Sequence, residues 1–169
     1  YQDHWRPMEV AFGQEAYGQH FDGFMRHYLT VRTDEIPRVK DVYEAFKEHA
    51  RSPEVAEDGV DGLVADIRTF AIHYCAMALG REEDPVLSTA FADLRELKVD
   101  VAYPLLLDMY RDYAAQRLSR DGFVQAVRWI ESYVFRRAVC SIPTNSMNKT
   151  FANFGKALDR DRYLDSIKA

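Results

Sequence analysis

The amino-acid sequence predicts an all-α protein of about seven or eight helices joined by short loops, with no β-sheet. Apolar residues recur at helical spacing along most of the chain. Phe21, Phe24, Met25, Tyr28 and Leu29, for example, fall at i, i+3, i+4, i+7 and i+8. No stretch of strand length alternates between apolar and polar residues. Prolines, glycines and capping residues separate the apolar stretches, so we expect each stretch to be one helix.

The composition is that of an ordinary globular protein. Its 169 residues are 47% apolar and 13% aromatic, which suffices for a single helical domain spanning residues 1–169. No apolar run reaches the length of about 18 residues that a membrane span needs, so we expect a cytoplasmic protein. Cys75 and Cys140 lie in apolar helical patterns, where we expect reduced core residues. Because the first residue is Tyr1, we expect a fragment of a longer chain.

The opening third of the sequence predicts a short helix and then a long one. Pro7 suits a first helical turn, and Gly13 suits the end of a short helix. The long helix should run from about Glu15 to Arg32. Ile36-Pro37 then breaks the pattern, because the residue before a proline disfavours helical backbone angles.

Two further helices are predicted before residue 80. One begins near Val39 and stops at Arg51-Ser52-Pro53. Residues 54–62 are acidic and contain two glycines, so we expect an exposed, flexible loop there. A central helix then follows from about Leu63 to Ala78, and Gly80 can end it in a left-handed conformation.

The next helices have recognisable starts. Asp84-Pro85 reads as an N-cap followed by a proline in the first turn. Pro104 is tolerated at the start of another helix, with Asp100 as a candidate cap. Ser119 is predicted to cap a long helix that begins near Arg120.

That long helix leads into a corner, where a proline stops one helix and polar residues start another. Its apolar stripe consists of Phe123, Val127, Ile130, Val134 and Ala138. Pro143 prevents simple continuation of the helix. The side-chain oxygens of Thr144, Asn145 and Ser146 could each cap the helix that follows, and residues 161–169 begin a last helix.

No constellation of residues predicts catalysis. The five histidines include no His-x-x-x-His or Glu-x-x-His pair, so the sequence predicts no metal site. The segment His4-Trp5-Arg6-Pro7 matches only a four-residue fragment of some metal-dependent nucleases. The eight glycines form no phosphate-binding loop, and no cofactor is expected.

The corner carries the candidate binding residues. From Trp129 to Ala169 there are seven Lys or Arg against four Asp or Glu, a net +3 in a chain of net −5. One interpretation joins Arg136, Arg137 and Lys149, with Asn145 and Asn148 as polar donors, into a site for a phosphate backbone. The other has the arginines pair with Glu131 or another carboxylate and donate to helix-end carbonyls.

Three segments of the chain resemble the helical region of GmrSD-type restriction proteins. They are Phe21 to Ala50, Asp93 to Tyr110, and Glu131 to Phe154, with the sequence ESYVFRRAVCSIPTNSMNKTFANF. In that family an N-terminal ParB/sulfiredoxin-like domain hydrolyses nucleotide and a C-terminal HNH-type nuclease cuts DNA. Neither the Asp-Gly-Gln-Gln-Arg motif of the first nor the Glu-His-x-x-Pro motif of the second is present here.

The resemblance therefore implies a non-catalytic helical connector and interaction domain of a DNA-targeting defence nuclease. Its partners would be the flanking domains of the same parent chain, and it transfers no catalytic residue to this sequence. Two alternatives remain open: a helical domain that contacts the DNA backbone, and a small-ligand-binding domain whose pocket is lined by tyrosines and phenylalanines.

Overall fold

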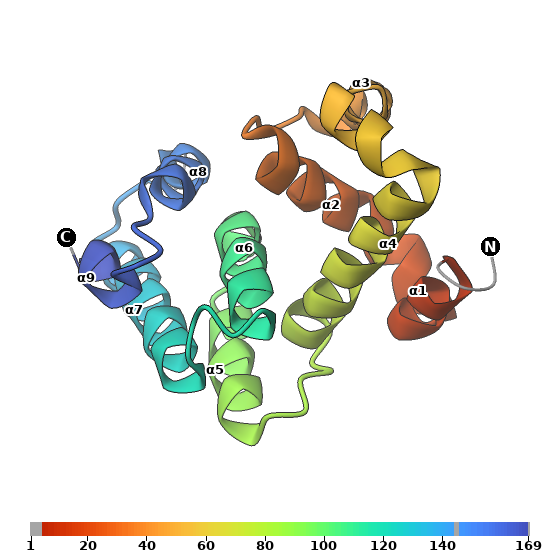
Figure 1. Ribbon diagram of the computed structural model, residues 1–169. Coiled ribbons are helices and arrows are strands. Elements are labelled where there is room, and N and C mark those ends of the chain that lie inside the picture. Colours follow the sequence, from red (N-terminus) through yellow and green to blue (C-terminus); the bar gives the residue numbers. More distant parts are fainter. Residues whose placement is uncertain (1–4, 144–145, 169) are drawn as a thin grey trace. The chain divides into compact units, whose positions relative to one another are not determined.

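The computed structural model describes residues 5–143 and 146–168 (Figure 1) and confirms the all-α class. Within these residues every regular element is a helix, and eight of the nine α-helices have at least eight residues. The α-helices and the two short 3-10 helices are α1 (Trp5–Phe12), α2 (Gln14–Thr33), η1 (Val39–Asp41), α3 (Val42–Ala50), α4 (Pro53–Ala78), α5 (Pro85–Glu96), η2 (Asp100–Ala102), α6 (Tyr103–Ala114), α7 (Arg120–Val139), α8 (Met147–Ala157) and α9 (Tyr163–Lys168).

The chain divides into two compact units, Tyr1–Cys75 and Ala76–Ala169. In the first unit α2 packs against both α1 and α3. Its core is built from aromatic rings: Phe24 is fully buried, with its centroid 5.7 Å from that of Phe12 and 5.5 Å from that of Tyr74. That the two units together form one domain stays a prediction.

The second unit is a bundle in which α7 packs against α5, α6 and α9, while α8 packs against α6 and η2. Figure 1 shows α9 lying against α7. Phe91 of α5 and Phe123 of α7 are both buried, with ring centroids 5.7 Å apart. This aromatic contact joins the two helices at the centre of the unit.

Several predicted helix ends are confirmed. The Asp84 carboxylate accepts hydrogen bonds from the backbone amides of Val86 and Leu87, and the Ser119 hydroxyl accepts one from Gly122. Gly80 has a φ of 69°, the left-handed conformation expected after α4. Asp100 begins η2 but makes no side-chain capping bond there.

The prediction of a flexible loop over residues 54–62 is wrong, because these residues belong to α4. Pro53 starts the helix and the carbonyl of Ser52 accepts a hydrogen bond from Ala56, so the stop after α3 is also the start of α4. The helix kinks at Gly59, whose φ of 69° and ψ of −177° are accessible only to glycine. Glycine, which the sequence suggested as a loop residue, here permits a kink within a helix.

The prediction of Cys140 as a core residue is also wrong. Cys140 follows the last residue of α7 and is exposed, and Ala138 is exposed too, so the buried stripe of α7 ends at Val134. Cys75 is buried, and neither of these two cysteines forms a disulfide. Thr144 and Asn145 lie outside the described residues, while Ser146 precedes α8 without a side-chain capping bond.

Candidate functional site

Arg137 is half-buried near the C-terminal end of α7, and its hydrogen bonds are made to residues of the same corner. Its guanidinium donates one hydrogen bond to the carbonyl oxygen of Pro143 at 2.6 Å and another to the Tyr133 hydroxyl at 3.1 Å. The guanidinium carbon also lies 5.6 Å from the centroid of the Tyr133 ring. Because its donors are turned toward the loop, Arg137 stabilises the end of α7 rather than projecting into solvent.

Arg136 points elsewhere and is exposed. Its Nε donates to the carbonyl of Ser132 at 3.2 Å, one turn back in the same helix. Glu131, the predicted partner of the arginines, is paired instead with Arg128, 2.7 Å from its guanidinium. Among the described residues no carboxylate lies within ion-pair distance of Arg136 or Arg137.

The remaining candidates of the predicted phosphate site lie on α8 or outside the described residues. Lys149 is exposed in the first turn of α8, and the neighbouring Asn148 is half-buried. Asn145 lies outside the described part of the chain. Of the predicted cations, Arg136 and Lys149 are therefore exposed and available to a ligand, whereas Arg137 is hydrogen-bonded within the corner.

A groove of about 560 Å³ opens beside Arg136, between α7, α8 and α9. Most of its lining is apolar or aromatic: Trp129, Ile130, Tyr133, Phe151, Phe154 and Ile167. Two hydroxyl side chains and one charged side chain complete it: Ser132, Thr150 and Arg136. We call this the α7–α8 groove. Phe151 is buried and Phe154 is half-buried, and both line this opening from α8.

An exposed apolar patch occupies the end of α7 outside the groove. Phe135 is 55% exposed, Val139 is 67% exposed and Ile142 is 45% exposed. Phe135 and Val139 are four residues apart, so they lie on one face of the helix. We call these three residues the α7 end patch. Large apolar side chains gathered at one place on a surface are typical of sites where another protein segment binds.

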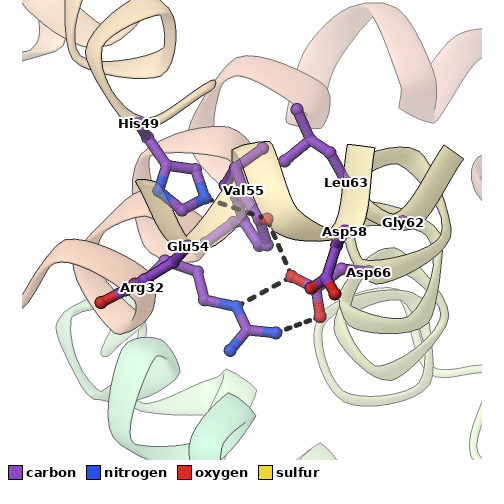
Figure 2. A pocket seen from close by; sticks show the side chains of 9 residues that line it. Arg32, His49, Glu54, Val55, Asp58, Gly62, Leu63 and Asp66 are labelled. Carbon is purple, nitrogen blue, oxygen red and sulfur yellow. Dashed lines mark hydrogen bonds and ion pairs between the residues drawn. The ribbon is translucent and has the colours of Figure 1, made fainter. Parts of the chain in front are cut away.

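The first unit holds a smaller and more polar pocket of about 160 Å³ between α2, α3 and α4 (Figure 2). The Tyr28 hydroxyl donates to Asp66 Oδ2 at 2.8 Å, and Arg32 Nε donates to the same oxygen at 2.8 Å. A second Arg32 nitrogen bonds the other oxygen of Asp66. His49 Nε2 lies 3.4 Å from the Tyr28 hydroxyl, completing a chain of four polar side chains.

The protonation states in this chain follow from burial and charge. Burial, with Arg32 nearby, lowers the pKa of His49, although Asp66 and Glu54 act in the opposite direction. Burial also raises the pKa of Tyr28, and the adjacent Asp66 raises it further. Near neutral pH His49 is therefore uncharged and Tyr28 keeps its proton. These four side chains link α2, α3 and α4 by hydrogen bonds, and Arg32 is the counter-charge of Asp66.

The kinked start of α4 forms one wall of this pocket. Glu54 and Asp58 line it, and Figure 2 shows Asp58 beside Asp66. A Cβ atom at Gly62 would come within 2.7 Å of the Cβ of Asp58, so a glycine is needed there for the helix to fold over the pocket. The acidic and glycine-rich composition of this segment, which suggested a loop, instead shapes the pocket wall.

Sequence reasoning missed the most buried ionic cluster. Asp112 of α6 is 0% exposed, and its carboxylate accepts hydrogen bonds from Arg117, Arg160 and Tyr163. Arg160 also donates to Asp108 at 2.7 Å. These contacts connect α6 to α9 and to the segment that leads into it, so the cluster holds these parts of the second unit together.

No protein-family model, no curated protein and no solved structure matches this chain. In the described part of the sequence no three His, Cys, Asp or Glu side chains gather in a way that could hold a metal ion. Over the same residues no helix is long and apolar enough to cross a membrane. Among the described residues, three surfaces are candidates for binding: the α7–α8 groove, the α7 end patch and the pocket beside the kinked start of α4.

Proposed function

We propose that this chain is a non-catalytic helical connector and interaction domain of a DNA-targeting defence nuclease. It would couple a nucleotide-hydrolysing domain to an HNH-type nuclease, would bind no cofactor itself and would act in the cytoplasm. The resemblance of three segments to the helical region of GmrSD-type restriction proteins motivates this assignment.

The observation that carries the proposal is the α7 end patch. Phe135 and Val139, one helical turn apart, and Ile142 just beyond the helix keep apolar side chains in water, and a binding partner would remove that exposure. The patch belongs to the Glu131 to Phe154 segment, which is also one of the three segments that carry the resemblance. We assign the flanking domains of the parent chain as its partners.

The buried polar groups are consistent with this role. Asp66 is held by Arg32 and Tyr28, and Asp112 is held by arginines and a tyrosine, so these carboxylates connect helices within each unit. Such hydrogen-bonded networks keep each unit rigid.

The test uses the full-length protein encoded by the gene that contains this chain. A Phe135→Asp/Val139→Asp variant should retain nucleotide hydrolysis and lose nucleotide-dependent DNA cleavage by at least about tenfold, because an interface of this kind depends on its apolar centre. A Val39→Asp/Val60→Asp variant is the matched control, since both valines are exposed apolar residues of the first unit. Unchanged cleavage in the patch variant, or a gene without the two flanking catalytic segments, would refute the proposal.

A second candidate function is contact with the DNA backbone, favoured by the exposure of Arg136 and Lys149 without a described carboxylate partner. If these cations contact phosphates, the chain should bind duplex DNA at low salt. Arg136→Gln and Lys149→Gln should each reduce the slope of log K against log salt by about one. Absence of binding at low salt would exclude this role for the chain.

A further inference from the structure

The α7–α8 groove has the size and lining of a small-molecule site. Its volume of about 560 Å³ lies within the range of about 300–1,000 Å³ found for ligand pockets. Trp129 and Tyr133 come from α7, and Phe151 and Phe154 come from α8. Because rings from two helices face one opening, a flat or aliphatic group entering it would contact apolar surface on both sides.

The described lining of the groove carries a positive charge and no negative one. Arg136 is the one charged residue among the described residues that line the groove, and no described carboxylate pairs with it. Its Nε is used by the Ser132 carbonyl, which leaves the two terminal nitrogens of the guanidinium with their donors available. A guanidinium of this kind binds carboxylate, sulfonate or phosphate oxygens through paired hydrogen bonds.

We propose that the α7–α8 groove binds a small amphiphilic anion, with an apolar or aromatic body between α7 and α8 and its acidic group at Arg136. A cationic ligand would meet Arg136 without any compensating carboxylate in the lining. A fully polar ligand would leave the aromatic walls without matching contacts. The Ser132 hydroxyl can donate a further hydrogen bond to the acidic group, whereas the Thr150 hydroxyl donates its proton to the Ser146 carbonyl at 3.0 Å. This site is independent of the connector role, since it needs no flanking domain.

Two fluorescent probes of similar shape but different charge test the assignment. The first, 8-anilinonaphthalene-1-sulfonate, is an aromatic anion, whereas N-phenyl-1-naphthylamine is its neutral counterpart. In a Trp5→Phe background Trp129 is the one tryptophan left in the chain, so energy transfer from it reports a probe bound near the groove. We expect the anionic probe to bind more tightly than the neutral one.

Variants then separate the two halves of the site. Arg136→Gln should weaken the anionic probe about tenfold and change the neutral probe by less than about twofold, because only the first has a charge for Arg136 to bind. Phe154→Ala should weaken both probes. Arg38→Gln, a change of an exposed arginine in the first unit, should affect neither.

The α7 end patch could also attract an apolar dye, so Phe135→Ser/Val139→Ser is measured beside these variants and should leave the affinity of both probes unchanged. Serine removes the apolar surface without placing a carboxylate one helical turn from Arg136. Three results would overturn the assignment: no energy transfer from Trp129, equal affinity for the two probes, or an Arg136→Gln variant that binds the anionic probe as tightly as the original chain. Thermal melting of each variant shows that a lost affinity is not a lost fold.

Discussion

Arg137 donates a hydrogen bond of 2.6 Å to the carbonyl oxygen of Pro143, so a side chain near the end of α7 holds the peptide segment that leaves the helix. Proline cannot extend the helix, and a backbone carbonyl that leaves a helix needs a hydrogen-bond partner. This contact determines how the two adjacent arginines of the corner differ in role.

The first prediction follows from that difference. Arg137→Ala should lower the free energy of unfolding by about 1–3 kcal/mol, because a hydrogen bond from a charged donor and the packing on Tyr133 are both lost. Arg136→Ala, the matched control, should change it by less than about 0.5 kcal/mol, as exposed substitutions usually do. Urea unfolding of both variants measures this. Equal losses for the two would contradict the assignment of roles.

The second prediction concerns Asp112. Asp112→Ala should cost about 2–4 kcal/mol, because the Tyr163 hydroxyl loses its buried acceptor and Arg117 and Arg160 lose a charged partner, although both arginines are partly exposed and Arg160 keeps Asp108. Asp161→Ala removes an exposed carboxylate near Arg160 in the sequence and should have little effect. Thermal unfolding of both variants gives the comparison. An Asp112→Ala variant as stable as the Asp161→Ala variant would show that the cluster does not hold α6 to the C-terminal segment.

A third prediction concerns pH. Because the pKa of His49 is lowered in the folded chain, the unfolded chain binds more protons as the pH falls through the ordinary histidine value of about 6.5. The contribution of neutral His49 to stability is thus complete above about pH 6.5 and decreases below it. Urea unfolding between pH 5 and pH 8 should show this decrease, and His49→Gln should reduce it. A variant with the same pH dependence as the original chain would argue against the lowered pKa.

The kink in α4 supplies the fourth prediction. Gly59→Ala should lower the free energy of unfolding by about 1–3 kcal/mol, since a residue with a Cβ is strained at a φ of 69° and a ψ of −177°. Gly18→Ala is the control, because Gly18 lies inside α2 and a Cβ there would have nothing within 4 Å. That change should stabilise the chain by about 0.5–1 kcal/mol. Effects of the same sign at both positions would contradict the kink.

Features that depend on neighbours along the chain could be predicted well. The Asp84 and Ser119 side chains accept hydrogen bonds from backbone amides two or three residues later in the chain. The residue types and their local spacing therefore suffice to predict these caps. The loop predicted over residues 54–62 failed for a related reason: glycine and acidic residues are typical of loops, but Gly59 permits a kink that keeps α4 helical on both sides.

Contacts between distant residues could not be predicted in this way. Arg160 and Tyr163 bond Asp112 from 48 and 51 residues away, and no local pattern marks them as partners. The same holds for Asp66, which takes its hydrogen bonds from Tyr28 and Arg32 on another helix. In the sequence, nothing distinguishes Asp66 or Asp112 from an exposed aspartate, because their partners are set by the packing of the helices.

The sequence by itself determined the all-α class, most of the helix ends and the concentration of cations at the corner after Trp129, because these depend on residue type and spacing alone. Only the tertiary structure decided that Arg137 faces Pro143 while Arg136 faces the α7–α8 groove. Adjacent residues on a helix point about 100° apart, so one of the two had to turn away from the other. Which one meets the loop depends on the path of the chain after α7, and that path is a property of the folded protein.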